Sequence, residues 1–126
     1  FSLARVEMNK KNYKKVIQLL SFTEYKEVFQ ALLSRNLLMA SYYELREWDS
    51  IESLFSSFKL YLDREKTLTK QRKEQYYKLI RYTRSLCKLN RGDKSKLLKL
   101  KEDIIQAEAV VNKPWLLEKI EEKLTV

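Results

Sequence analysis

Glycine and proline, the residues that most often interrupt regular secondary structure, each occur only once in this chain of 126 residues. Average usage is about 7% for glycine and about 5% for proline. Leucine, lysine and glutamate are abundant, and apolar residues recur at spacings of three and four, as on one face of an α-helix. The sequence therefore predicts an all-α fold without a long linker.

Six to seven helices account for almost the whole chain in this pattern. We place them at residues 1–9, 12–22, 26–46, 49–66, 69–90, 93–111 and 114–124. Thr69 and Asp93 are the expected N-caps of the fifth and sixth helices, because short polar side chains accept hydrogen bonds from free backbone N–H groups. Gly92 is expected to end the fifth helix in the left-handed conformation, and Pro114 suits the first turn of the last helix.

The stretch SYYELREWDSIESLF (41–55) has the pattern of two helices joined by a tight turn, although it contains neither glycine nor proline. We expect a short turn, with the next helix capped by its own polar residues, Asp49 and Ser50. Asp49 also suits the positive end of the helix dipole. Trp48 and Tyr42 are expected to pack across the turn.

Stripes of apolar residues at helical spacing predict the core. Two aromatic stripes consist of Phe22, Tyr25 and Phe29, and of Phe55, Phe58 and Leu62. Cys87, the single cysteine, lies on an apolar arc and is expected to be a small core residue. One thiol cannot form an internal disulfide, which favours a reducing compartment and predicts a cytoplasmic location.

The residue types that catalysis and metal binding need are nearly absent. The chain has no histidine, so the commonest general base and metal ligand is missing, and one glycine cannot make a phosphate-binding loop. The carboxylate pairs Glu102–Asp103 and Glu121–Glu122 are adjacent in sequence, so on a helix the two side chains point about 100° apart. We therefore expect no enzyme activity and no cofactor or metal.

Two segments repeat. NYKKVIQLL (12–20) and EWDSIESLF (47–55) align at an offset of 35 residues. The aligned pairs are Tyr13 with Trp48, Val16 with Ile51, Leu19 with Leu54 and Leu20 with Phe55, and one helix earlier Leu3 with Leu38 and Ala4 with Met39. A period close to 34 residues with an aromatic residue after the turn is typical of one helical repeat family.

The first half of the chain resembles the tetratricopeptide repeat family, in which each repeat is a pair of antiparallel helices. The second copy matches best, through Leu38, Tyr42, Trp48 and Phe55, and the first keeps Leu3, Ala4 and Tyr13. Where the family has a glycine facing an alanine, this chain has Ala4 with Val16 and Met39 with Ile51, so the paired helices are expected to lie further apart.

The resemblance implies a solenoid segment of antiparallel helix hairpins. Residues 1–66 would form two pairs, the first one truncated, and residues 67–126 a divergent pair and a C-terminal capping helix in the same compact unit. The last helix could instead form a dimer seam, which leaves a homo-oligomer open. Since the chain starts at Phe1 within a helical pattern, and about three repeats are usually needed for stability, we expect it to be the C-terminal part of a longer protein.

The function implied by this family is protein–protein interaction, as a scaffold or adaptor for an unidentified protein or peptide. Its binding groove is lined by the first helix of each pair. The residues carried over to that groove are Arg5, Asn9, Asn36, Ala40, Tyr43 and Glu44. Asn36 and Tyr43 are the strongest candidates, because an amide can clamp a peptide backbone and a tyrosine offers both area and a hydroxyl.

The net charge of +9 is concentrated in the second half, where residues 64–126 carry 17 basic and 9 acidic side chains. The fifth helix carries a basic stripe made of Lys70, Lys73, Tyr77, Arg81, Arg84 and Lys88. A solubilising face is the simplest interpretation. Nucleic acid is the alternative partner, since cations with an interleaved tyrosine contact phosphates and stack on bases, and an acidic protein segment is a third. No run of 18 apolar residues predicts a membrane span.

Overall fold

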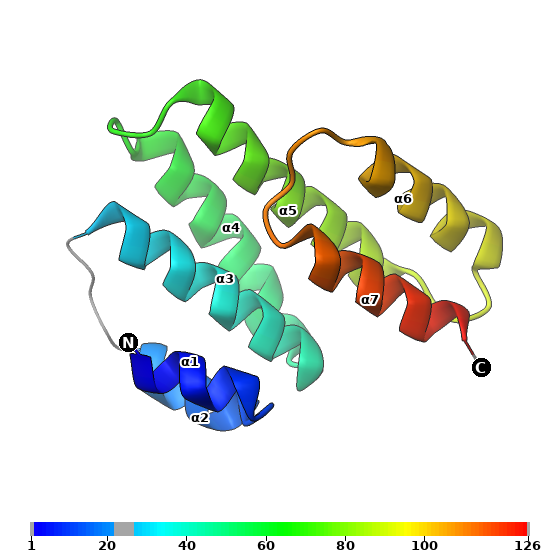
Figure 1. The fold of residues 1–126 in the computed structure, drawn as a ribbon, viewed down its shortest axis with the longest axis horizontal. Coiled ribbons are helices and arrows are strands. Elements are labelled where there is room, and N and C mark those ends of the chain that lie inside the picture. Colours follow the sequence, from blue (N-terminus) through cyan, green and yellow to red (C-terminus); the bar gives the residue numbers. More distant parts are fainter. Residues whose placement is uncertain (1, 22–26, 126) are drawn as a thin grey trace. The chain divides into compact units, whose positions relative to one another are not determined.

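A computed structural model describes residues 2–21 and 27–125. Within these ranges it contains seven α-helices and no strand, which confirms the all-α prediction (Figure 1). The helices are α1 (Ser2–Asn9), α2 (Tyr13–Leu20), α3 (Val28–Glu44), α4 (Trp48–Arg64), α5 (Lys70–Lys88), α6 (Lys94–Gln106) and α7 (Lys113–Leu124).

The chain divides into two compact units, Phe1–Leu60 and Tyr61–Val126, with the boundary inside α4. In the first unit α2 packs closely against both α1 and α3. In the second, α5 packs against α6 and α7, which also pack against each other. Each unit has its own buried apolar core.

The core of the first unit lies where α1, α2 and α3 meet. Ala4, Val16, Leu20 and Leu38 form one buried cluster, and Leu54 of α4 packs against it. The described apolar residues of this unit that are at least 99% buried are Ala4, Val16, Met39, Ile51, Phe55 and Phe58. The two repeat copies therefore bury the aligned pairs Ala4 with Met39 and Val16 with Ile51, although the copies differ in side-chain size.

The aromatic stripes were predicted with mixed success. Phe55, Phe58 and Leu62 are buried, as expected. The prediction that Phe29 is a core residue is wrong, because 67% of its surface is exposed at the start of α3. Phe22 and Tyr25 lie outside the described residues. Phe29 is the second residue of α3, so it lies in the first turn of the helix.

The turn between α3 and α4 is closed by an arginine in the left-handed conformation. Arg46 has φ 58°, its N–H donates to the carbonyl of Tyr43, and the N–H of Glu47 donates to the carbonyl of Tyr42. This pair of bonds is a Schellman motif, which satisfies carbonyls that the helix end leaves free. No glycine is needed, although a side chain in this conformation costs roughly 1–2 kcal/mol.

The turn between α1 and α2 has the same construction. Lys11 has φ 60°, its N–H donates to the carbonyl of Met8, and the N–H of Asn12 donates to the carbonyl of Glu7. Lys11 and Arg46 are 35 residues apart, the same offset as the sequence repeat. Each position of the motif in one turn therefore has its equivalent in the other.

The expected packing across the second turn is corrected in one residue. Trp48 makes an edge-to-face contact with Tyr43, with ring centroids 5.7 Å apart and an interplanar angle of 78°. Tyr42 packs instead against the core cluster of the first unit. The helix begins at Trp48, so Asp49 lies within its first turn. There its negative charge interacts favourably with the positive end of the helix dipole.

Three cations from elsewhere in the second unit close the C-terminal ends of its helices. Lys123 Nζ of α7 donates to the carbonyls of Leu86 (2.7 Å) and Leu89 (2.6 Å) at the end of α5. Lys113 Nζ donates to the carbonyls of Ile105 (3.0 Å) and Ala107 (2.9 Å) at the end of α6.

Arg91, from the turn between α5 and α6, completes this arrangement. Its Nη1 donates to the carbonyl of Thr125 at 2.7 Å, just after α7. Cations at helix C-termini satisfy free carbonyls and interact favourably with the negative end of the dipole. Part of the basic excess of residues 64–126 is therefore structural.

Helix ends in the second unit differ from prediction at three points. Gly92 does not adopt a positive φ, and Leu89, in an extended conformation, follows α5. Asp93 stands at the N-cap of α6, but its carboxylate accepts from the N–H of Asn90 (2.8 Å) rather than from α6. The sixth helix ends at Gln106, not at 111, because the backbone becomes extended at Ala107.

Two further helix signals are confirmed. The hydroxyl of Thr69 accepts a hydrogen bond from the N–H of Arg72 (3.1 Å) and caps α5. Pro114 lies in the first turn of α7, where a missing N–H has no cost. The residue before that helix, Asn112, takes the left-handed conformation with φ 59°.

Candidate functional site

The six predicted groove residues all lie in the first unit, but their exposure differs. Arg5 and Asn9 are exposed on α1. Asn36 and Glu44 are half-buried on α3. Ala40 and Tyr43 are buried, with 2% and 9% of their surface exposed. Two of the six side chains are therefore fully available to a partner, and two more are only partly accessible.

Tyr43 serves the turn between α3 and α4. Its ring packs against Trp48, so its contact area is largely used within the protein. Trp48 itself keeps 43% of its surface exposed. The sequence predicted a packing role for Trp48 and did not indicate this exposed face. A residue that opens a helix immediately after a turn has one side open to solvent, and this position was the available signal.

The basic stripe lies entirely on α5. Lys70, Arg81, Arg84 and Lys88 are exposed, and Lys73 and Tyr77 are half-buried. The guanidinium carbon of Arg81 lies 5.2 Å from the ring centroid of Tyr82, a cation–π distance. The side chains of Lys70, Lys73 and Lys88 form no hydrogen bond or ion pair with another residue in the described ranges.

Tyr77 is held by the end of α4. Its hydroxyl donates a hydrogen bond to Asp63 Oδ1. Burial raises the pKa of Tyr77 to about 12, and the hydrogen bond to Asp63 and the charges of Asp63 and Glu74 act in the same direction. The tyrosine of the stripe is therefore already engaged, which reduces its use as a stacking platform.

The raised pKa of Tyr77 predicts a loss of stability in alkali. An unfolded tyrosine titrates near 10, so between pH 10 and about 12 the folded state keeps a proton that the unfolded state has lost. The stabilisation is complete below pH 10 and disappears as the pH rises toward 12. We expect the free energy of unfolding to fall more steeply over this window in the wild type than in Tyr77→Phe, measured by urea denaturation.

Tyr82→Phe, on the same helix, is the control for this comparison. It should leave the pH dependence as in the wild type. Equal slopes in wild type and Tyr77→Phe would contradict the role assigned to the bond between Tyr77 and Asp63.

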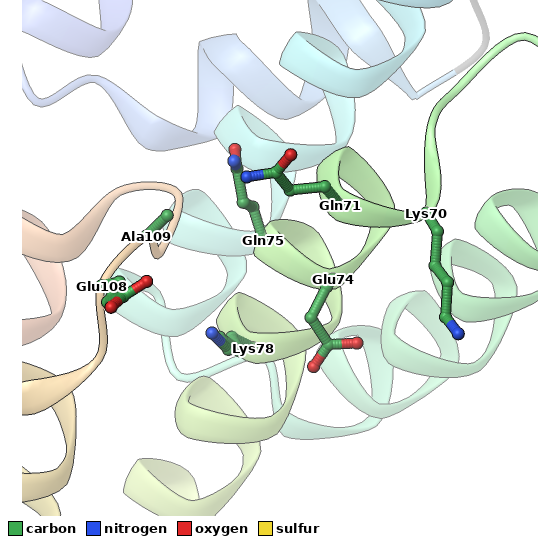
Figure 2. Close-up of a pocket in the computed structure, with 7 residues that line it drawn as sticks. All are labelled: Lys70, Gln71, Glu74, Gln75, Lys78, Glu108 and Ala109. Atoms are coloured by element: carbon green, nitrogen blue, oxygen red, sulfur yellow. The ribbon is translucent and has the colours of Figure 1, made fainter.

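A further feature, which the sequence did not indicate, is a hollow of about 560 Å³ that is open to solvent. We call it the α5 hollow. Its lining residues are Lys70, Gln71, Glu74, Gln75 and Lys78 of α5, and Glu108 and Ala109 of the loop after α6 (Figure 2). None of its four charged side chains forms a hydrogen bond or ion pair with another described residue.

The acidic pairs of α6 and α7 have structural partners. Asp103 pairs with Lys99 at 3.0 Å, and Glu102 accepts a hydrogen bond from Gln106 at 2.7 Å. Glu121 pairs with Lys101, which joins α7 to α6. Glu122 pairs at 2.6 Å with Lys119, whose side chain is only 8% exposed.

Metal-binding clusters and membrane-spanning helices are both absent from the described part of the chain. Residues 2–21 and 27–125 contain no group of three or more Cys, Asp or Glu side chains placed to hold a metal ion. None of the helices in these ranges has the length and the apolar content needed to cross a bilayer.

Comparisons with protein-family models, with curated proteins and with solved structures gave no match for this chain.

Proposed function

We propose that this chain is a protein-interaction module made of antiparallel helix hairpins of tetratricopeptide type. The observation that carries the proposal is the pair of identical Schellman turns at Lys11 and Arg46, separated by the 35 residues of the sequence repeat. The buried pairs Ala4 with Met39 and Val16 with Ile51 follow the same offset. Stacked hairpins of this kind characteristically present an extended binding surface.

The binding face would be formed by the exposed groove residues of α1 and the half-buried groove residues of α3. Asn9 and Asn36 supply amides that can both donate to and accept from a peptide backbone. Arg5 and Glu44 add one charge of each sign, which suits a partner segment with complementary charges. Tyr43, being buried, is assigned to the architecture of the turn.

Removal of the two amides tests this face. The Asn9→Ala, Asn36→Ala double variant should lose the proteins that the immobilised wild-type chain captures from a lysate. Each neutral hydrogen bond contributes about 0.5–1.5 kcal/mol, so two such losses weaken binding by about tenfold. Quantitative mass spectrometry of the captured proteins measures the effect, in about 0.2 M salt to suppress purely ionic binding.

Gln18→Ala, which removes an exposed amide from α2, is the matched control. Thermal unfolding of each variant shows whether the fold is retained. Capture of the same proteins in the same amounts by wild type and double variant would contradict the proposed face.

Nucleic-acid binding through the basic stripe is the second candidate. It is supported by the exposed cations Lys70 and Lys88, which form no ion pair with a described residue. Its test is fluorescence anisotropy of a labelled oligonucleotide at about 50 and 200 mM salt. Binding that weakens steeply with salt and disappears in Arg81→Glu, Arg84→Glu would favour it, and no binding at low salt would eliminate it.

A further inference from the structure

The α5 hollow has an ordered arrangement of charges. Lys70, Glu74 and Lys78 follow one another at intervals of four residues, so positive, negative and positive groups alternate along one row of the helix. Gln71 and Gln75 form a neighbouring row with the same interval. In Figure 2 the two glutamine side chains lie next to each other, while Lys70 and Glu74 lie on the side of α5 away from the loop.

The interval of these rows matches an extended polypeptide. Four residues of α-helix advance about 6.0 Å. Two residues of an extended strand advance about 6.4–6.8 Å, and its side chains return to the same face at that interval. Three alternate side chains of an extended peptide would therefore meet Lys70, Glu74 and Lys78 in turn.

The glutamines suit the backbone of such a peptide. Each amide has donors and acceptors. Backbone N–H and C=O groups also repeat every second residue along one edge of an extended chain. Gln71 and Gln75 can thus contact two successive repeats of that edge, while the charged row contacts the side chains.

The loop after α6, which lines one side of the hollow, is held in place by hydrogen bonds. The loop after α6 is joined to α5 by a bond from the N–H of Val111 to the carbonyl of Gln75 (3.4 Å). The ammonium group of Lys113 holds the start of this loop by a hydrogen bond to the carbonyl of Ala107. A volume of about 560 Å³ is within the range of about 300–1,000 Å³ that is usual for ligand sites.

We propose that the α5 hollow binds an extended peptide segment with the pattern acidic-x-basic-x-acidic. The inference rests on the proposed function in that the chain binds polypeptide, but it assigns a second surface with its own specificity. Glu74 and Glu108 balance the charges of Lys70 and Lys78, so the hollow lacks the positive excess that binds nucleic acid, and a peptide of alternating charge suits it better.

The experiment measures fluorescence anisotropy of labelled peptides with the 126-residue chain. The first peptide has the pattern Glu-x-Lys-x-Glu with threonine at x. A second has the same composition in the order Glu-x-Glu-x-Lys, so that net charge is equal, and a third is the reversed pattern Lys-x-Glu-x-Lys. Two charge pairs change from attractive to repulsive between the first and second peptides, so we expect about tenfold tighter binding of the first.

A variant in which the three charges of the row are reversed provides the decisive test. Lys70→Glu, Glu74→Lys, Lys78→Glu keeps alternating charges at i, i+4, so the helix itself is not destabilised by like-charge pairs. This variant should prefer Lys-x-Glu-x-Lys. Lys96→Glu, an exposed reversal on α6, should keep the wild-type preference. The double variant Gln71→Ala, Gln75→Ala should bind all three peptides more weakly and leave the order of their affinities unchanged.

Equal binding of the first two peptides by the wild type, or an unchanged preference in the reversed variant, would overturn this inference. The Asn9→Ala, Asn36→Ala variant separates the two proposals. It should bind the first peptide as the wild type does, because both asparagines belong to the α1 and α3 face. Failure of the peptide test alongside lysate capture that depends on these asparagines would overturn the hollow and leave the proposed function intact.

Discussion

Replacement of Phe58 by alanine is expected to lower the free energy of unfolding by about 3–5 kcal/mol. Phe58 is completely buried in α4. Its removal loses the transfer free energy of the ring and leaves a cavity that the surrounding helices can fill only in part. Chemical denaturation followed by circular dichroism at 222 nm measures the change.

Leu60→Ala is the matched control for Phe58→Ala, two residues further along the same helix. Leu60 is 46% exposed, so its truncation should change stability by about 0.5 kcal/mol or less. Similar losses for both variants would show that the face of α4 assigned to the core is wrong.

The second large effect is expected for Lys123→Met. The substitution keeps most of the apolar stem but removes the ammonium group that binds the carbonyls of Leu86 and Leu89. Hydrogen bonds with a charged partner contribute about 1.5–3 kcal/mol, and a cation at a partly buried helix C-terminus adds up to about 2. We expect a loss of about 2 kcal/mol in the free energy of unfolding.

A local measurement distinguishes this cap from a general effect of charge. Hydrogen exchange of the amides in the last turn of α5 should become faster in Lys123→Met, while that of α6 stays closer to the wild type. Lys96→Met removes an exposed lysine of α6 and should leave both unchanged. Unchanged exchange at the end of α5 in Lys123→Met would show that the ammonium does not hold it.

Regular periodicity made the helices and much of the core predictable. Phe55, Phe58 and Leu62 are buried because α4 is long and regular enough for spacing alone to define its inner face. The prediction for Phe29 was wrong because this residue lies at the start of a helix, and the apolar pattern did not locate that start. The predicted end of α6 was wrong for a related reason. Ala107 and Glu108 are good helix formers, so their residue types do not mark the point at which the backbone becomes extended.

Turn chemistry was predictable in position but not in the residue that forms it. The turn before α4 was expected, but its left-handed residue is Arg46, while the single glycine, Gly92, does not use this conformation. Residue type gives a preference for left-handed geometry, and hydrogen bonds such as that from Glu47 to Tyr42 can outweigh it.

The candidate surfaces were the least predictable part. In the sequence Arg91 and Lys123 are ordinary members of a basic segment, and only the meeting of distant helix ends shows what they bind. The α5 hollow depends in the same way on loop residues that lie 30 or more positions after the residues of α5 that line it. No local pattern contains that information.

The cap that Lys123 provides at the C-terminal end of α5 also bears on the order in which the second unit folds. Lys123 lies 37 and 34 residues after the carbonyls that it binds. During synthesis the last turn of α5 therefore waits, with these carbonyls hydrated, until α7 has left the ribosome. Contacts between distant parts of a chain form late, since loop closure must come first. Hence α5 should fray at its C-terminal end in nascent chains that stop before α7, and become closed only when α7 docks.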